Sequence, residues 1–131
     1  MISIDKFKGK EIRRIVELEN EDGTVEQIVI KNPNKKVKNE FVEVMTEAKE
    51  KDDGFYQIEY LIKELTNIEL TVSLADFLRN EYIHPAMNDV LKEISSILFE
   101  LVKELSLTIE VETGMDEAQH LLLKQLKDDI Q

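Results

Sequence analysis

The feature that most constrains the fold of this chain is a long helical periodicity between Ala86 and Leu107. Apolar residues recur there at intervals of four, three, four, three and four, which places them on one side of a helix. This heptad seam consists of Met87, Leu91, Ile94, Leu98, Leu101 and Leu105. Other apolar residues of the segment lie outside the seam, namely Val90, Ile97, Phe99, Val102 and Leu107. We therefore expect neighbours to cover this helix on more than one side.

A β-hairpin is indicated by residues 11–31. Two runs rich in Ile and Val flank residues 20–23, and their Asp-Gly pair favours a tight turn because glycine accepts a positive φ. Apolar side chains alternate along both runs, interrupted by Arg14, so one face should be covered. Because two strands alone are marginally stable, that face must pack on helices or on another subunit. Ile2 and Ile4 are candidates for a short third strand.

Three further helices are expected between the hairpin and the long helix. Residues 35–51 form a surface helix with one apolar stripe, for which Asn34 is a candidate cap. Residues 55–67 predict a second helix from the spacing of their apolar side chains. The third begins after Ser73 as its candidate cap and should stop near His84, because the following proline disfavours helical geometry there.

Two elements are expected after the long helix. Thr108–Glu112 alternates apolar and polar residues, which indicates a short strand. Residues 113–131 predict an amphipathic tail helix, and docking on the domain or waiting for a partner both remain open. The sequence thus predicts an α+β fold that is mainly α, with an N-terminal hairpin and four to five helices. Residues 1–112 would form a single domain that precedes the tail.

Composition limits the partners more than the architecture. The 131 residues include 28 Asp and Glu against 17 Lys and Arg, a formal net charge of −11. Such a surface disfavours nucleic acid and anionic membranes, so we expect neither as a partner. Cysteine is absent, which excludes disulfide scaffolds and thiolate metal sites. With no signal-like or membrane-spanning apolar run, we expect a cytoplasmic protein.

Motifs for catalysis, cofactors or metals are missing from the sequence. His84 and His120 stand apart without a metal-binding pattern around them. The glycines are isolated and make no phosphate-binding loop, and no serine lies in a nucleophile elbow. The lysines of residues 35–38 form the only dense basic cluster, for which a solvated helix end is favoured over a phosphate contact. We expect a binding protein without cofactor or enzymatic activity.

The order of these features resembles the tail assembly chaperones of long-tailed bacteriophages. The resemblance is carried mainly by residues 73–105, SLADFLRNEYIHPAMNDVLKEISSILFELVKEL, with support from the hairpin. It implies a small acidic protein that coats the tape-measure protein during virion tail assembly, keeps its apolar helices soluble and oligomerises. The resemblance is a pattern of helices, so it carries over no individual binding residue.

The leading hypothesis is therefore a phage or prophage tail assembly chaperone whose long helix binds apolar helices of the tape-measure protein. Candidate partner contacts, chosen from the helical periodicity, are Ile94, Ile97, Leu98, Leu101 and Val102. One alternative is a structural or adaptor subunit of a phage neck or tail, in which the same surface joins identical copies. Another is an acidic inhibitor that mimics nucleic acid and binds a basic protein.

Overall fold

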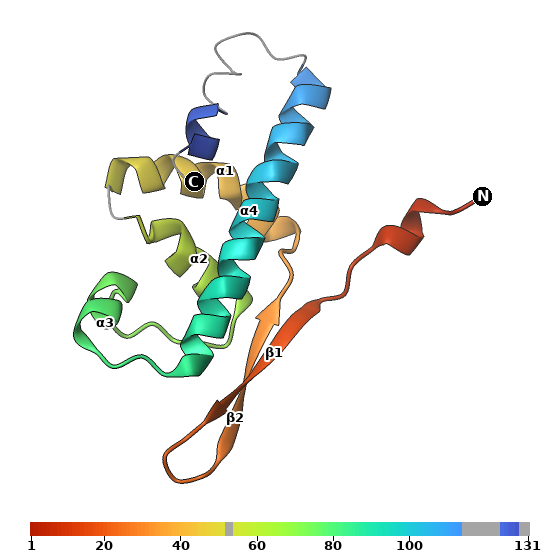
Figure 1. Cartoon of the computed structure of the whole chain (residues 1–131). Coiled ribbons are helices and arrows are strands. Elements are labelled where there is room, and N and C mark those ends of the chain that lie inside the picture. The colour runs from red at the N-terminus through yellow and green to blue at the C-terminus, as the bar shows by residue number, and fades with distance from the viewer. Residues whose placement is uncertain (52–53, 114–123, 129–131) are drawn as a thin grey trace.

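A computed structural model describes residues 1–51, 54–113 and 124–128. Strands β1 (Ile12–Glu19) and β2 (Val25–Lys31) form an antiparallel hairpin, which follows a short 3₁₀ turn at Ile4–Phe7. The helices are α1 (Lys35–Lys51), α2 (Tyr56–Leu65), α3 (Leu74–Asn80) and α4 (Pro85–Thr113). This confirms the predicted α+β fold, mainly α, with an N-terminal hairpin (Figure 1).

The hairpin forms where the sequence predicts it, with one face against the helices. Val16 and Ile30 are buried, while Leu18 and Ile28 pack partly against the same core. Gly23 has a φ of 85°, which confirms why glycine is needed in the turn. The covered face therefore follows from the alternation of the sequence.

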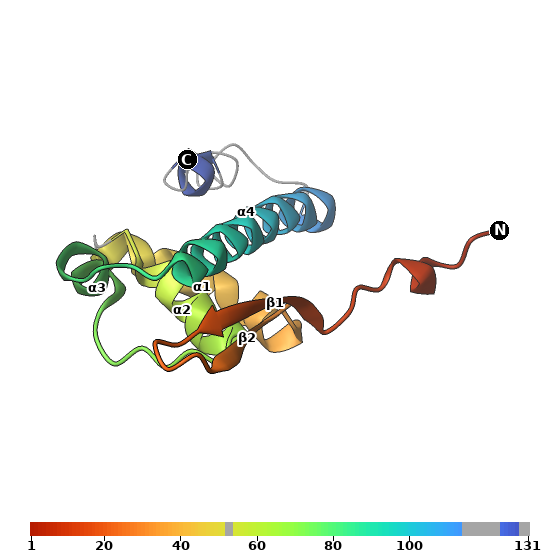
Figure 2. The same ribbon diagram turned by 60° about the horizontal axis from the view of Figure 1, so that its bottom comes forward.

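The predicted third strand is wrong. Residues 1–10 are exposed throughout, and they lead away from the body of the protein as an arm (Figures 1 and 2). In place of a strand, Ile4–Phe7 forms a 3₁₀ turn in which the Ser3 hydroxyl accepts a hydrogen bond from the Asp5 amide. A local side-chain contact of this kind offers the backbone an alternative to a sheet ladder.

The caps of the middle helices are confirmed, but one helix is shorter than predicted. Asn34 Oδ1 accepts a hydrogen bond from Val37 N at 3.0 Å, and Ser73 Oγ accepts one from Asp76 N at 3.2 Å. Helix α3 ends at Asn80, so the predicted end near His84 is wrong. Beyond the end of α3 the next buried residue is Ala86, and a helix gains most of its stability from packing.

The long helix α4 extends further than predicted, through Thr113. The predicted strand at Thr108–Glu112 is therefore wrong, because these residues continue the helix. A lone stretch of alternating residues gains no ladder hydrogen bonds without a partner strand, whereas each added helical residue forms one more bond. Gly114, the first glycine since Gly54, follows the last residue of α4.

The core lies along one side of α4, which packs against α1, α2 and β1 (Figure 2). This confirms that α4 is covered by more than one neighbour. Its Val90, Ile94 and Ile97 have no exposed surface, like Leu61 and Ile62 of α2. Of the predicted tail helix at 113–131, only the helical turn Lys124–Asp128 lies within the described residues beyond α4, and its Leu126 is 9% exposed and belongs to this core.

We expect Ile94→Ala to destabilise the protein by about 2–5 kcal/mol, because it deletes buried methyl groups from the middle of α4. Ser95→Ala, at the adjacent exposed position, is the matched control and should change the free energy of unfolding by less than about 0.5 kcal/mol. Urea denaturation followed by circular dichroism measures both. If Ile94→Ala lowered the free energy of unfolding as little as the control does, the packing described above would be contradicted.

Candidate protein-binding surfaces

Two consecutive arginines on β1 attach the hairpin to α4. Arg13 donates from Nη1 and Nη2 to the two carboxylate oxygens of Glu100 at 2.7 and 2.9 Å, and from Nε to Glu93 at 3.1 Å. Arg14 lies 3.6 Å from Glu93 and 3.9 Å from Asp89. The fork of a guanidinium suits a carboxylate, so this contact sets the position of the hairpin along α4.

A β-bulge brings both arginines to the same helix. Ile12 pairs with Lys31, and Arg14 pairs with Ile30, which is adjacent to Lys31 in β2. Arg13 is therefore an extra residue in β1. In a regular strand neighbouring side chains point to opposite faces, and a bulge changes that direction. Arg13 and Arg14 therefore both reach the acidic side of α4.

The electrostatics of Arg13 and Glu100 follow from this contact. The hydrogen bond from Arg13 holds the pKa of Glu100 below its usual value, although partial burial acts the other way. The same hydrogen bond raises the pKa of Arg13. Both groups stay charged at neutral pH, and their role is to attach the hairpin to α4.

Asn32 anchors the point where the arm leaves the domain. Its Nδ2 donates to Lys10 O at 2.7 Å, and its backbone N donates to Glu11 O at 2.8 Å. Its Oδ1 accepts from Arg13 Nη1 at 3.4 Å. The beginning of β1 is thus held in place while residues 1–10 remain exposed.

His84 joins the end of β1 to the beginning of α4. The amide of Ala86 donates to His84 Nδ1 at 3.0 Å, so Nδ1 is the unprotonated nitrogen of the ring. Nε2 then carries the hydrogen and donates to Glu19 O at 3.1 Å. The ring is a connecting element between two backbone groups, which agrees with its predicted position at a boundary between helices.

Polar contacts also join α2 to α1. The Tyr60 hydroxyl donates to Glu40 at 2.7 Å, and the Tyr56 hydroxyl donates to Glu47. Burial and the contact with Glu40 raise the pKa of Tyr60, while the hydrogen bond to Glu47 raises that of Tyr56. The hydroxyls therefore remain protonated donors and add polar contacts between the two helices.

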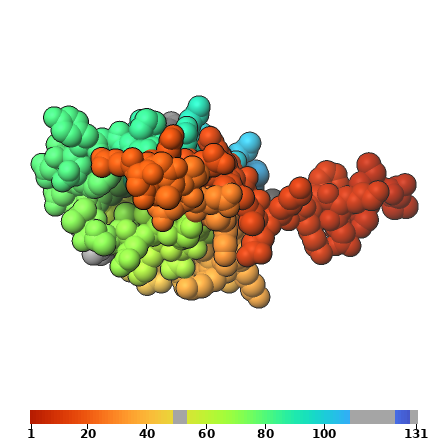
Figure 3. Space-filling view, turned by 90° about the horizontal axis from the view of Figure 1, so that it is seen from below, coloured from red at the N-terminus to blue at the C-terminus, as the bar shows by residue number. Residues whose placement is uncertain are grey.

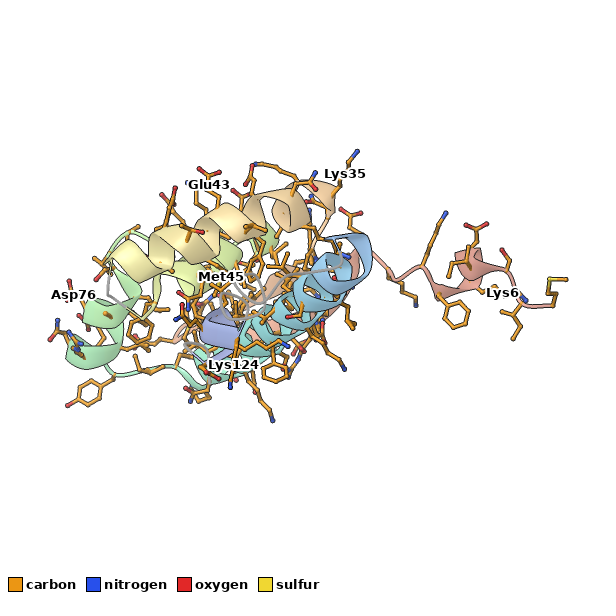
Figure 4. All side chains as sticks on the ribbon, turned by 90° about the horizontal axis from the view of Figure 1, so that it is seen from above. Lys6, Lys35, Glu43, Met45, Asp76 and Lys124 are labelled. Atoms are coloured by element: carbon orange, nitrogen blue, oxygen red, sulfur yellow. The ribbon has the colours of Figure 1, made fainter. Side chains whose placement is uncertain are left out.

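The basic cluster at the beginning of α1 is largely engaged within the protein. Lys36 Nζ lies 3.4 Å from Glu64 of α2, and Lys38 Nζ lies 3.2 Å from Glu104 of α4. Lys35 is exposed at the helix end, as Figure 4 shows. Two of the three lysines therefore balance carboxylates of neighbouring helices.

All five candidate partner contacts lie in the chain's own core. Ile94 and Ile97 are completely buried, and the exposed fractions of Leu98, Leu101 and Val102 are 5%, 4% and 8%. They share that core with Leu126 from the turn at 124–128, and Figures 1 and 4 show this turn beside α1 and α4. A partner can therefore reach these side chains only if a segment that covers them, such as the turn at 124–128, moves away.

The exposed apolar residues of α4 lie next to this covered side. Phe99 and Leu107 are 55% and 54% exposed. Because residues three and seven apart share a helix face, Phe99 lies beside Val102 and Ser106, which are both buried. Phe99 therefore continues the apolar surface of Val102 toward solvent.

Sequence reasoning missed the contacts of Arg13 and Arg14. The available signal was a pair of arginines in an apolar strand together with carboxylates at 89, 93 and 100, which recur at intervals of four and seven along a helix. It was not decisive, because the sequence does not show that a bulge turns Arg13 toward that helix.

The described residues offer no group of three or more Asp, Glu, His or Cys side chains placed to hold a metal ion. Among the helices that the structure describes, none is long and apolar enough to cross a membrane. No protein-family model, curated protein or solved structure matches the chain. The surfaces themselves are therefore the guide to the function of the protein.

We expect Glu100→Gln to lower the free energy of unfolding at pH 7 by about 0.5–1 kcal/mol, a small value because Glu100 is half exposed. The pKa of Glu100 is depressed in the folded protein, so its contribution is present above the ordinary glutamate pKa of about 4.3 and is lost as the pH falls through the folded value. Denaturation at pH 7 and in acid measures this difference.

The stabilities of Glu100→Gln and the unchanged protein should therefore converge in acid. Glu81→Gln, at an exposed position before α4, is the control and should have little effect at neutral pH. If the difference in unfolding free energy between Glu100→Gln and the unchanged protein were the same at every pH, the charge of Glu100 would not stabilise the hairpin contact.

Proposed function

We propose that this protein is an assembly chaperone that binds an apolar helix of a larger protein. The observation that carries the proposal is the packing of the turn at Lys124–Asp128, whose Leu126 is buried in the core beside α1 and α4. A short helical segment, separate from α1 and α4, thus supplies an apolar side chain to this surface. A client helix of similar pattern can use the same surface.

The small free energy of the Leu126 contact favours replacement of the turn by a client helix. Leu126 is the one buried residue of the described turn, since Lys124, Gln125, Lys127 and Asp128 are exposed. Burial of a single leucine contributes about 1.5–3 kcal/mol. A longer amphipathic helix that buries several apolar residues gains more than the turn does, and can therefore displace it.

The client class follows from the resemblance to tail assembly chaperones of long-tailed bacteriophages. Their client is the tape-measure protein, which consists of long apolar helices. A chain of net charge −11 keeps such a complex soluble by mutual repulsion between complexes. Phe99, which extends the apolar surface beyond Val102, is the exposed residue that the client would meet first.

Co-expression with a tape-measure protein encoded in the same genome tests this function. We expect the client to become soluble and to co-purify with the chaperone. Phe99→Glu should lower the recovered complex about tenfold or more, because it places a charge in the apolar contact. Thr71→Glu, which adds the same charge at an exposed position between α2 and α3, away from this face of α4, is the control.

Leu126→Ala provides the opposite test on the same surface. We expect it to strengthen client binding, because the turn then competes less well for the site. Circular dichroism confirms that each variant is folded. An insoluble client, or a complex that is indifferent to Phe99→Glu, would reject the proposal. A fixed oligomer that takes up no client would favour the structural-subunit alternative.

A further inference from the structure

The exposed arm formed by residues 1–10 carries an unusual density of unburied apolar side chains. Met1, Ile2, Ile4 and Phe7 are each at least 70% exposed. Figure 3 shows the arm leading away from the face on which the hairpin lies. Apolar side chains concentrated in a short exposed segment are typical of a segment that is covered by a partner.

The arm also differs in charge from the rest of the chain. It contains Lys6, Lys8 and Lys10 but only one carboxylate, Asp5, which gives a formal charge of +2. Since the whole chain carries −11, the remaining residues carry −13. A surface of this same protein is therefore electrostatically complementary to its own arm.

One edge of the hairpin is closed by a side chain. Val29 N donates to Asn67 Oδ1, and Asn67 Nδ2 donates to Gln27 O, both at 3.0 Å. The polar backbone groups of Val29 and Gln27 therefore point away from β1. This contact occupies the middle of the β2 edge.

The other edge is occupied at Glu19, whose carbonyl accepts a hydrogen bond from His84 Nε2, and is open further along β1. In an antiparallel pair, two residues that face each other direct their backbone N–H and C=O groups either both toward the partner strand or both away from it. Ile15 faces Val29 and Glu17 faces Gln27, so Ile15 and Glu17 direct their amides and carbonyls toward the free edge of β1. No hydrogen-bond partner for these groups occurs in the described part of the chain.

The surroundings of this edge match the arm in character. Ile15 and Val25 are 47% and 55% exposed on the outer face of the hairpin. Next to them a hollow of about 610 Å³ lies between the hairpin turn and the beginning of α4. Its lining includes the carboxylates of Glu17, Glu19, Glu21 and Asp89. The β1 edge thus offers backbone groups, apolar side chains and negative charge together.

We propose that the arm of one copy docks along the free β1 edge of a second copy. Ile2 and Ile4 cover the outer apolar side chains, and the lysines of the arm approach the carboxylates of the hollow. The backbone of the arm satisfies the open groups of Ile15 and Glu17 by adding a strand. The partner is therefore another molecule of this same chain.

Docking on the arm's own hairpin is disfavoured by geometry. The hollow lies at the turn end of the hairpin, whereas the arm leaves from the opposite end, at Ile12. To reach back, the chain would have to reverse at Lys10 and Glu11, whose carbonyls are both held by Asn32. The arm therefore points outward, where a second molecule can receive it.

Charge exchange between two variants tests the proposal with the full-length chain. In one variant Lys6→Glu and Lys8→Glu make the arm negative. In the other Glu17→Lys and Glu21→Lys make the receiving edge positive. We expect the unchanged protein to self-associate, each variant alone to do so at least tenfold more weakly, and an equimolar mixture to regain association through the restored opposite charges.

Sedimentation velocity over a range of concentrations measures the association, and circular dichroism confirms that each variant is folded. Lys92→Glu with Lys103→Glu, on the exposed side of α4, is the matched control and should associate like the unchanged protein. A monomeric unchanged protein, an oligomer indifferent to the arm variants, or a mixture that does not regain association would each overturn the proposal.

Discussion

Burial of one side of α4 is the constraint on which the other elements depend, because none of them has enough apolar surface to fold alone. A two-stranded hairpin is marginal in water, and α3 has only seven residues. Val16 and Ile30 supply the apolar part of the hairpin's contact, and Arg13 fixes its position through Glu93 and Glu100. Apolar burial thus supplies the attraction, while the ion pairs select one arrangement.

The sequence was a good guide wherever a local pattern decides the structure. The bounds of α1, the hairpin turn at Gly23 and the caps Asn34 and Ser73 all follow from residues close in sequence. It failed where tertiary packing decides. The alternating residues at 108–112 have no strand to pair with and continue α4, and the arm does not join the sheet although its apolar residues are suited to a strand.

The candidate surface was predictable in part. Periodicity correctly placed Ile94, Leu98 and Leu101 on one side of a long helix, but the same pattern describes a core and an interface equally well. What covers that side is decided by chain segments far away, including Leu126. The contacts of Arg13 depend on a single extra residue in β1, which leaves no local signature in the sequence.

Asn67 has a consequence for how far the hairpin sheet can extend by pairing with other hairpins. Because its amide occupies the middle of the β2 edge, a strand that joins the hairpin has only the β1 side available. Fibrous aggregation by edge pairing requires two open edges on every molecule, so that each added chain templates the next. If two hairpins pair through their β1 edges, both outer edges of the joined sheet are β2 edges held by Asn67, so this mode of sheet growth ends at two molecules.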